Sequence, residues 1–341
     1  MQKVNWGIIG LGSVANEFAK GFFNLNSAKI LSIASTDKKK INDFKKKFNI
    51  PNNFCFDNYD KLLEQKKIDI VYIALPTFLH KTWIINSLNN KKNTLVEKPA
   101  VMNSQEILEI KKHDISESHF FEAYMYLFHP QILKTLELIK QGEIGELISM
   151  ESYFGSNLLT KKNWFGFTKK KNINPNKRIF NKEMGGGAIL DLGCYPVSFS
   201  TKIASLKSPN NFEKINLIDP QNTIGFTGVE VDSYVTIKFD NNFTSKIAAS
   251  FSRDLGKRSV INGSKGKIII EDTWTSNPSK IILKKNNELV FNFKSEDSIY
   301  SYEIDALSKF IKNKKSKNDQ VFDIDQSIIN MKIIDQWKNK I

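Results

Sequence analysis

Apolar runs of strand length alternate with longer amphipathic stretches over the first third of the chain. The apolar runs cover residues 4–9, 30–34, 70–74, 94–97 and 120–124. Residues 14–25, 38–48 and 59–65 have helical spacing, and Asn103 with Glu106 fits an N-terminal helix cap. A repeated strand-then-helix order predicts a parallel, doubly wound sheet.

The pattern changes after Pro130. One helix is predicted over residues 131–141, and the strands predicted after it are 150–154, 231–239, 243–251, 267–271, 281–284 and 289–293. The turns at 240–242 and 262–266 are short, so neighbouring strands should be antiparallel. The pattern therefore predicts an α/β chain of two domains, 1–122 and 123–341. The second is an α+β domain with a large, mostly antiparallel open sheet, and its C-terminal helix is free to pack back on the first domain.

The predicted strand 231–239 has two different faces. Val235, Ile237 and Phe239 give one apolar face, which should pack on helices. The other face carries Tyr234 and Thr236, neither of them charged. An uncharged open face predicts an oligomer contact, in a homodimer or homotetramer.

The high positive charge of the chain raises the question of a nucleic acid partner. The chain has 341 residues and a formal charge of +14, but the basic residues are nearly all lysine. Its arginines, Arg178, Arg253 and Arg258, lie outside any basic motif, and base-specific readers depend on bidentate arginine. We expect no nucleic acid partner, with a charge-driven nucleic-acid binder as an alternative, and interpret the charge as solubility with attraction for anions.

Several classes are disfavoured by what the sequence lacks. No apolar run has the length of a membrane span, and no signal-like segment opens the chain. The two cysteines, Cys55 and Cys194, are not in metal-ligand spacing, and neither are the four histidines. We expect a cytoplasmic protein with no membrane partner and no metal.

A glycine-rich turn follows the first predicted strand. Gly10, Gly12 and Ala15 form G-x-G-x-x-A, with Ser13 and Val14 between them. Gly10 permits a tight turn, Gly12 lets the backbone approach a pyrophosphate, and Ala15 allows close packing of helix and strand. In a strand–turn–helix context this pattern favours dinucleotide binding over a merely structural turn.

The end of the second predicted strand should distinguish NAD from NADP. An acid there would bind the ribose 2′-hydroxyl, whereas a small residue near a cation would tolerate a 2′-phosphate. Ser35 is small, Thr36 can form a hydrogen bond, and Lys38 begins a run of lysines. Asp37 comes two residues late and could instead cap the next helix. We favour NADP, with NAD as the alternative.

Polar residues follow two later strands at the edge where open α/β sheets bind ligands. Pro76, Thr77 and His80 follow the third strand, and Glu97-Lys98-Pro99 ends the fourth, because Pro99 cannot continue a sheet ladder. A lysine at this edge can transfer a proton or supply positive charge. Alternatively, Lys98 is a solvated strand end and His80 a local hydrogen-bonding residue.

A second chemical stretch begins at three glycines, residues 185–187. Asp191 and Tyr195 are four residues apart on the predicted helix, so they share a face that could bind hydroxyls and move a proton. An acid at a helix start with a packing tyrosine is an equally good interpretation.

The order of these motifs resembles the Gfo/Idh/MocA family of NAD(P)-dependent oxidoreductases, over nearly the whole chain. The resemblance rests on residues 7–12, 76–80, 97–99, 122–125 and 185–195. Residues 124–131 and 193–196 look like the branch that contains dimeric dihydrodiol dehydrogenase and D-xylose 1-dehydrogenase. The resemblance implies a Rossmann domain followed by a substrate-binding and oligomerisation domain.

The resemblance also implies roles for particular residues. Those implied to bind the cofactor are Gly10, Gly12, Ser13 and Val14 at the pyrophosphate, Ser35, Thr36 and Lys38 at the ribose, and Pro76, Thr77, His80, Glu97 and Lys98 toward the nicotinamide. Lys98 and Tyr195 would be the catalytic pair, with Asp191 orienting the substrate or the tyrosine. His129 is a further candidate for binding substrate hydroxyls, and Arg178 for binding a substrate carboxylate or phosphate, with a solvated loop residue as the alternative. Trp164 and Phe165 are candidates for stacking on a sugar or for packing.

The implied reaction is hydride transfer between nicotinamide and a carbinol or carbonyl of a sugar, polyol or trans-dihydrodiol. Positive charge from Lys98 would lower the pKa of Tyr195, which favours Tyr195 as the base with Lys98 assisting. A non-catalytic NAD(P)-binding regulator of the same fold is the alternative, and retention of both Lys98 and Tyr195 favours an enzyme.

Overall fold

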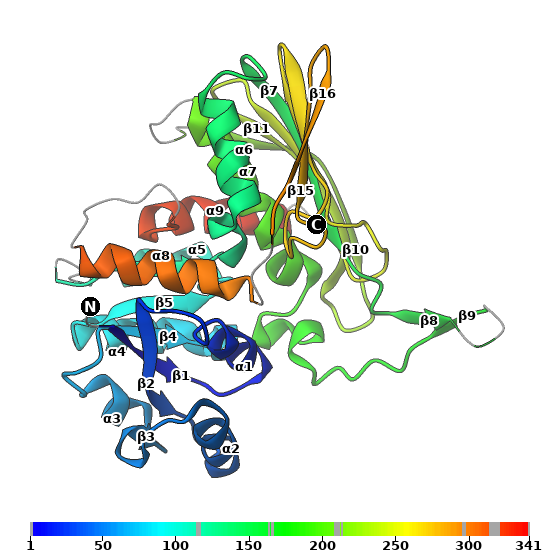
Figure 1. Cartoon of the computed structure of the whole chain (residues 1–341). Helices are drawn as coiled ribbons and strands as arrows, with labels where there is room; N and C mark the ends of the chain where they lie inside the picture. Colours follow the sequence, from blue (N-terminus) through cyan, green and yellow to red (C-terminus); the bar gives the residue numbers. More distant parts are fainter. Residues whose placement is uncertain are drawn as a thin grey trace. The chain divides into compact units, whose positions relative to one another are not determined.

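The computed structural model describes residues 3–113, 117–162, 164, 167–207, 212, 214–294, 298–313 and 321–339. The chain forms two compact units (Figure 1). The first contains residues 1–129 and 295–328, and the second contains residues 130–294 and 329–341. The boundary predicted after residue 122 stays a prediction about functional domains.

A six-stranded parallel sheet forms the centre of the first unit. Its strands, in the order β3-β2-β1-β4-β5-β6, are β1 (Val4–Ile9), β2 (Ala28–Ala34), β3 (Cys55–Phe56), β4 (Ile70–Ile73), β5 (Asn93–Glu97) and β6 (Phe120–Ala123). The order reverses beside β1, so the predicted doubly wound parallel sheet is confirmed. The strand interiors are fully buried and apolar, which is the pattern of a sheet covered on both faces.

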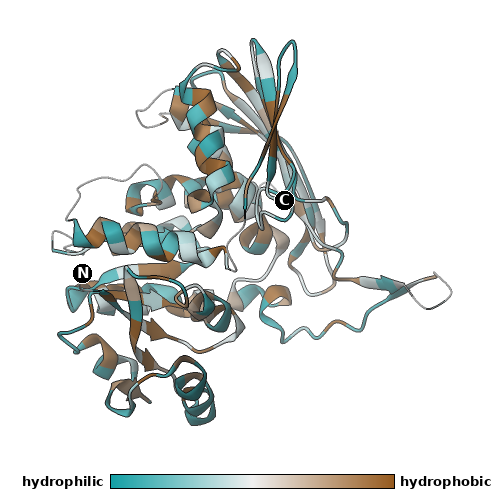
Figure 2. Ribbon diagram, in the orientation of Figure 1, coloured by the Kyte–Doolittle hydropathy of each residue, from teal (hydrophilic) through white to brown (hydrophobic). Residues whose placement is uncertain are grey.

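Helices accompany this sheet. They are α1 (Ser13–Lys20), α2 (Lys38–Phe48), α3 (Tyr59–Leu63), α4 (His80–Asn89), α5 (Ser104–Lys111) and α8 (Tyr300–Lys312). Figure 2 shows α2 mostly hydrophilic, because only Ile41 and Phe44 are buried among its lysines. Helix α1 ends at Lys20 rather than near residue 25, and α8 passes the following Gly21 so closely that a Cβ there would lie 2.8 Å from Ile304 Cδ1.

An eight-stranded sheet forms the second unit, with α6 (Pro130–Lys140) and α7 (Cys194–Lys207) along one of its faces (Figure 1). In sheet order the strands are β10 (Ile215–Ile224), β11 (Glu230–Phe239), β12 (Thr244–Ser250), β7 (Leu147–Gly155), β13 (Ser259–Gly263), β14 (Gly266–Ile270), β15 (Lys280–Lys284) and β16 (Glu288–Asn292). Only β12 and β7 pair in parallel among them, so the predicted mostly antiparallel sheet is confirmed. Further elements here include the hairpin β8 (Thr160–Lys162) with β9 (Thr168–Lys170), and α9 (Ile324–Asn339), whose first residues belong to the first unit.

Two strands of this sheet were not predicted. Strand β10 contains Pro220 and a left-handed Asp219, and its pairing with β11 shifts between Ile218 and Gln221. A proline is tolerated there because β10 lies at the sheet edge. Strand β13 runs to Gly263 and β14 begins at Gly266, so the turn predicted over 262–266 is only two residues long.

Candidate functional site

The start of α1 has the geometry of a pyrophosphate site. Gly10 has φ +87°, and a Cβ there would lie 2.6 Å from the carbonyl oxygen of Ala74. A Cβ on Gly12 would meet nothing within 4 Å. Gly12 precedes the helix without a side-chain cap, so the first N–H groups of α1 have no capping side chain. Ser13 and Val14 are exposed here, and Ala15 is buried against the sheet, so the residues present fit a dinucleotide.

Asp37 caps helix α2, as one of the two interpretations of the sequence predicted. Its Oδ1 accepts hydrogen bonds from the backbone N–H groups of Lys39 (2.9 Å) and Lys40 (3.2 Å). The Asp37 N–H in turn donates to the Ser35 hydroxyl oxygen at 3.1 Å. Thr36 and Lys38 are exposed beside this turn. The acid nearest the end of β2 is therefore engaged in helix capping.

A cavity of roughly 310 Å³ opens next to this turn. It is lined by Lys38, Ile41 and Asn42 of α2, by Cys55, Phe56 and Asp57 at the end of β3, and by Lys61 of α3. Burial raises the pKa of the Cys55 thiol, with Lys45 acting in the opposite direction. Two lysines and an amide give this cavity donors for an anionic group, and Asp57 is its one acidic lining residue.

Lys98 follows β5 directly and is half-buried. The side chain of its neighbour Glu97 accepts a hydrogen bond from the Tyr72 hydroxyl on β4. Burial, followed by the charge of Glu97, raises the pKa of Tyr72 well above its usual range, so the phenol keeps its proton. The upstream side of the Lys98 loop is thus tied to the adjacent strand.

His80 ties the same loop to the end of β4. Its Nδ1 lies 3.1 Å from the carbonyl oxygen of Pro99 and 3.2 Å from that of Ala100, and its Nε2 lies 2.7 Å from that of Leu75. Its side chain is only 1 % exposed, and neighbouring Thr77 is 3 % exposed. His80 therefore brings the loop that contains Pro76 and Thr77 together with the Lys98 loop, as the hydrogen-bonding interpretation predicted. Direct contact with a cofactor stays a prediction for these three residues.

In the second unit, Asp191 lies on a π-helical turn, Ile189–Gly193, that leads into α7. The sequence predicts an ordinary α-helix here, whereas the structure has a π-helical turn. Such turns are often found at functional sites. Arg178 Nη2 donates to Asp191 Oδ1 at 2.6 Å, with the two side chains 33 % and 16 % exposed. The structure thus brings together two predicted substrate residues that are 13 positions apart in the chain.

Aromatic rings surround Tyr195, which is 6 % exposed. The ring of Phe154 lies edge-on at 5.3 Å between centroids, and that of Trp274 lies at 5.7 Å. The Trp274 indole N–H donates to the carbonyl oxygen of Tyr153 at 2.9 Å. Rings on two sides restrict the orientation of the tyrosine.

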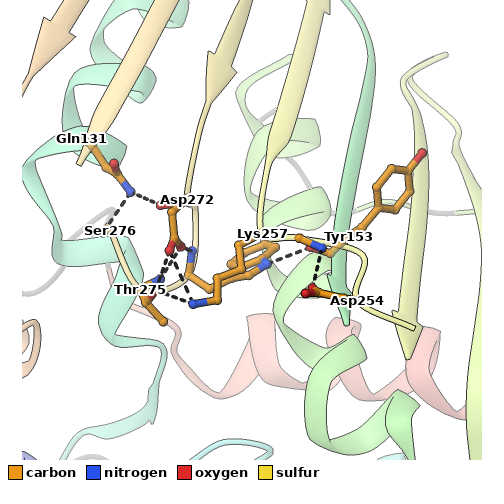
Figure 3. Close-up of polar contacts among 9 residues, drawn as sticks. Gln131, Tyr153, Asp254, Lys257, Asp272, Thr275 and Ser276 are labelled. Carbon is orange, nitrogen blue, oxygen red and sulfur yellow. Dashed lines mark hydrogen bonds and ion pairs between the residues drawn. The ribbon is translucent and has the colours of Figure 1, made fainter. Parts of the chain in front are cut away.

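The loop that carries Trp274 is fixed by Asp272 (Figure 3). Asp272 Oδ1 accepts from the N–H groups of Trp274 (3.1 Å) and Thr275 (2.8 Å), and Oδ2 lies 3.5 Å from Lys257 Nζ. The Gln131 amide donates to the Asp272 carbonyl oxygen at 2.7 Å. Sequence reasoning missed Trp274 and Asp272, because only the fold brings the Trp274 ring to Tyr195, and Asp272 acts through the loop that carries Trp274.

Glu230 was missed as well. Gly187 has φ +113°, and a Cβ there would lie 2.1 Å from Glu230 Oε2. Glycine is therefore needed at the entrance to the π turn, both for its backbone conformation and for the approach of this 5 % exposed side chain.

The other predicted residues have mixed outcomes. His129 is 1 % exposed with its ring edge-on to Tyr302, and burial lowers its pKa to about 4. Trp164 is 97 % exposed, so the packing interpretation is wrong for it, and Phe165 lies outside the described residues.

Because Lys98 belongs to the first unit and Tyr195 to the second, their pairing stays a prediction.

Within the described residues, none of the helices is both long and apolar enough to cross a membrane. No group of three His, Cys, Asp or Glu side chains is placed to hold a metal ion in that same part of the chain.

Relatives and solved structures of similar fold include several oxidoreductases. Trans-1,2-dihydrobenzene-1,2-diol dehydrogenase of Mus musculus is 28 % identical over 283 residues, which are 82 % of this chain and 78 % of the relative. Its counterpart in Xenopus laevis is 26 % identical, covering 83 % and 80 %. Aldose–aldose oxidoreductase from Caulobacter crescentus, solved with glycerol, matches with a TM-score of 0.84 at 16 % identity over 99 % and 97 % of the two chains. A 3-ketoreductase from Actinomadura kijaniata, solved with NADP and TDP-benzene, gives 0.79 at 19 % identity over 99 % and 98 %.

Family models account for most of the chain. Residues 4–121 match the oxidoreductase family with an NAD-binding Rossmann fold, and residues 132–269 match the GFO/IDH/MocA C-terminal domain. The predicted family is confirmed, and the chain belongs to the GFO/IDH/MocA family of NAD(P)-dependent oxidoreductases.

Proposed function

We propose that this protein is a dehydrogenase or reductase that acts on a CH–OH group of an uncharged, hydroxylated small molecule. The observation that carries the proposal is the placement of Lys98. It is half-buried at the carboxyl end of β5, in a loop held by His80 and by the Tyr72–Glu97 hydrogen bond. A fixed, partly desolvated ammonium group at this edge suits charge and proton handling beside a nicotinamide.

Tyr195 exchanges the proton in this proposal. A bound nicotinamide supplies or accepts the hydride. An ordinary tyrosine has a pKa of about 10, too high for efficient base chemistry at neutral pH. Positive charge from Lys98 would favour the tyrosinate, so Tyr195 would take the carbinol proton in oxidation and return it in reduction.

The Arg178–Asp191 pair supports an uncharged substrate. The guanidinium carries one positive charge, and it already lies 2.6 Å from a carboxylate, so an anionic substrate group would gain little attraction there. Carboxylate oxygens and guanidinium N–H groups suit hydroxyls instead. We therefore assign sugars, polyols or trans-dihydrodiols as the substrate class.

NADP is the favoured cofactor. Asp37 caps α2 instead of standing ready for a ribose 2′-hydroxyl, and the cavity beside it is lined by Lys38 and Lys61. The relatives support the proposal in general terms, because two of them are diol dehydrogenases. The 3-ketoreductase was solved in complex with NADP, both as a lysine variant and as a tyrosine variant. We also propose a homo-oligomer that forms through the open sheet, and a cytoplasmic location.

Nicotinamide fluorescence during titration with NADPH and NADH tests the cofactor assignment. We expect tighter binding of NADPH, and tighter NADH binding would overturn the choice of NADP.

Aldoses, polyols and dihydrodiols are then screened for turnover with wild type, Lys98→Met and Tyr195→Phe. Each variant should lose at least about a hundredfold in kcat. Cofactor binding without turnover of any substrate would favour the non-catalytic regulator, and binding of neither cofactor would contradict the oxidoreductase.

A further inference from the structure

Glu122 is a buried carboxylate that the proposed chemistry does not use. It lies on β6 with only 3 % of its surface exposed. Its Oε1 accepts a hydrogen bond from the N–H of Ala100 at 2.9 Å, two residues after Lys98. Its Oε2 accepts from the hydroxyl of Ser327 at 2.5 Å, and Ser327 is fully buried in the first turn of α9. One side chain thus joins the Lys98 loop to a segment more than 200 residues later.

These contacts satisfy the backbone hydrogen-bonding groups of Pro99 and Ala100. Pro99 has no N–H, and its carbonyl oxygen and that of Ala100 both face His80 Nδ1. The Ala100 N–H is the remaining donor of these two fully buried residues, and Glu122 accepts from it. Without this acceptor the Ala100 N–H would be a buried donor without a partner. The loop would then shift until that N–H found another acceptor.

The segment around Ser327 is itself firmly placed. Asp323 Oδ1 accepts from the N–H groups of Asp325 (3.0 Å) and Gln326 (3.1 Å), and the Gln326 side chain accepts from the Asp323 N–H at 3.1 Å. This reciprocal cap fixes the start of α9. Just before it, the carbonyl oxygen of Phe322 accepts from the Glu122 N–H at 3.0 Å. Residues 322–327 therefore hold both the backbone and the side chain of Glu122.

We infer that Glu122 and Ser327 are positioning residues for Lys98, which hold the loop after it by way of the Ala100 N–H. The inference rests on the proposed role of Lys98. A displacement of about 1 Å at a reacting group can cost on the order of a hundredfold in rate, so a fixed loop matters for function. Burial raises the pKa of Glu122, against the lowering effect of hydrogen bonds from Ser327, Ala100 and Tyr124, so retaining an acid here costs folding stability. A functional reason for the acid accounts for that cost.

Amide hydrogen exchange at Ala100 tests the contact without any substrate. We expect Ser327→Ala to speed exchange at Ala100 by about fivefold to tenfold. This factor corresponds to the stabilisation that a single hydrogen bond contributes. Ser327→Thr, which keeps the hydroxyl, should restore slow exchange. Ser308→Ala is the matched control, because Ser308 is equally buried and accepts from Trp6 Nε1 at 3.0 Å, away from this loop. Unchanged exchange in Ser327→Ala would overturn the inference.

Kinetics then separates positioning from general stability. Ser327→Ala and Glu122→Gln should lower kcat about tenfold and leave KM and NADPH affinity within about twofold. In a Lys98→Met background, Ser327→Ala should lower the residual rate no further, because the residue that it positions is gone. An equal loss with and without Lys98 would contradict positioning. If wild type binds neither cofactor, the proposed function fails, while the exchange experiment still decides whether Ser327 and Glu122 hold the loop.

Discussion

His129 and Glu303 are buried ionisable side chains whose pKa values are moved in opposite directions by the same cause. Burial lowers the pKa of His129 to about 4 and raises that of Glu303 well above its usual range. Burial favours the neutral form of both side chains, so His129 tends to release a proton on folding whereas Glu303 tends to take one up. The two residues make opposite contributions to the pH dependence of stability.

We expect His129 to destabilise the fold in acid. The unfolded chain binds a proton at His129 below about pH 6.5, whereas the native chain does so only near pH 4, so native stability falls as the pH drops through this window. The loss amounts to up to about 3 kcal/mol. Urea unfolding of His129→Phe at pH 7 and pH 4.5 should show a smaller loss than wild type, with His113→Gln as the control. An unchanged loss would contradict the prediction.

We expect Glu303 to destabilise the fold at high pH. Among the described residues neither of its carboxyl oxygens has a hydrogen-bond partner, and the Glu97 charge adds to the effect of burial. Because the folded pKa is raised, the native chain holds a proton that the unfolded chain has lost above about pH 4.5. Glu303→Met should raise stability by roughly 1–3 kcal/mol at pH 8 and by less at pH 5.

The measurement for Glu303 is the urea midpoint of wild type and variant at both pH values. Glu17→Gln, on the exposed face of α1, controls for the loss of an acid. A gain that is equal at the two pH values would show that Glu303 does not titrate as its burial indicates.

At the scale of the element, the two glycines of the turn before α1 have different roles: Gly10 is needed for the backbone conformation, and Gly12 for the approach of the ligand. Gly12 is extended with open space beside it, so Gly12→Ala should change folding stability by less than about 1 kcal/mol. The added methyl group would occupy the space assigned to the pyrophosphate, so NADPH affinity should fall at least about tenfold. Gly10→Ala, which would clash with the Ala74 carbonyl, should instead destabilise the protein. Unchanged NADPH affinity in Gly12→Ala would contradict the placement of the pyrophosphate.

Elements that obey a local rule were predictable from the sequence. The period of two in β11, the cap at Asp37 and the glycine turn after β1 each depend on a few consecutive residues. Strand β10 was missed because a proline and a bulge interrupt its pattern. The π turn was missed because its hydrophobic pattern resembles that of an ordinary helix.

The contacts that hold the candidate site were much less predictable. Glu122 and Ser327 are 205 positions apart, and Arg178 and Asp191 meet across three glycines. Periodicity carries no information about such pairs. Asp191 was singled out by its motif, Arg178 as a lone arginine in a long loop, and Glu122 only as part of a motif behind the family resemblance, but their partners come only from the fold.

At the scale of the whole molecule, the open face of the eight-stranded sheet carries an uncharged row of side chains beside a row that contains Lys246 and Glu151. Tyr234 and Tyr153 lie on either side of Ala248 in the paired strands, and both tyrosines are half-buried. Burial, followed by the charge of Glu151, raises the pKa of Tyr153 to about 12, so this ring stays neutral. The opposite face of the same strands, including Val235 and Ile237, is fully buried, as the sequence predicted.

Two tyrosines around a small alanine offer a flat centre for a second copy of the chain, and a symmetric contact would bring the same rings together. We expect wild type to be a dimer or tetramer by light scattering at micromolar concentration. Tyr234→Lys should give monomers, because each copy would bury a positive charge against its equivalent. Phe23→Lys, which changes an aromatic side chain 65 % exposed on the first unit, is the control and should keep the wild-type mass. NADPH affinity should remain within about twofold in Tyr234→Lys, because Tyr234 belongs to the second unit and the proposed cofactor residues belong to the first. A monomeric wild type, or a Tyr234→Lys variant of unchanged mass, would show that this face does not form the contact.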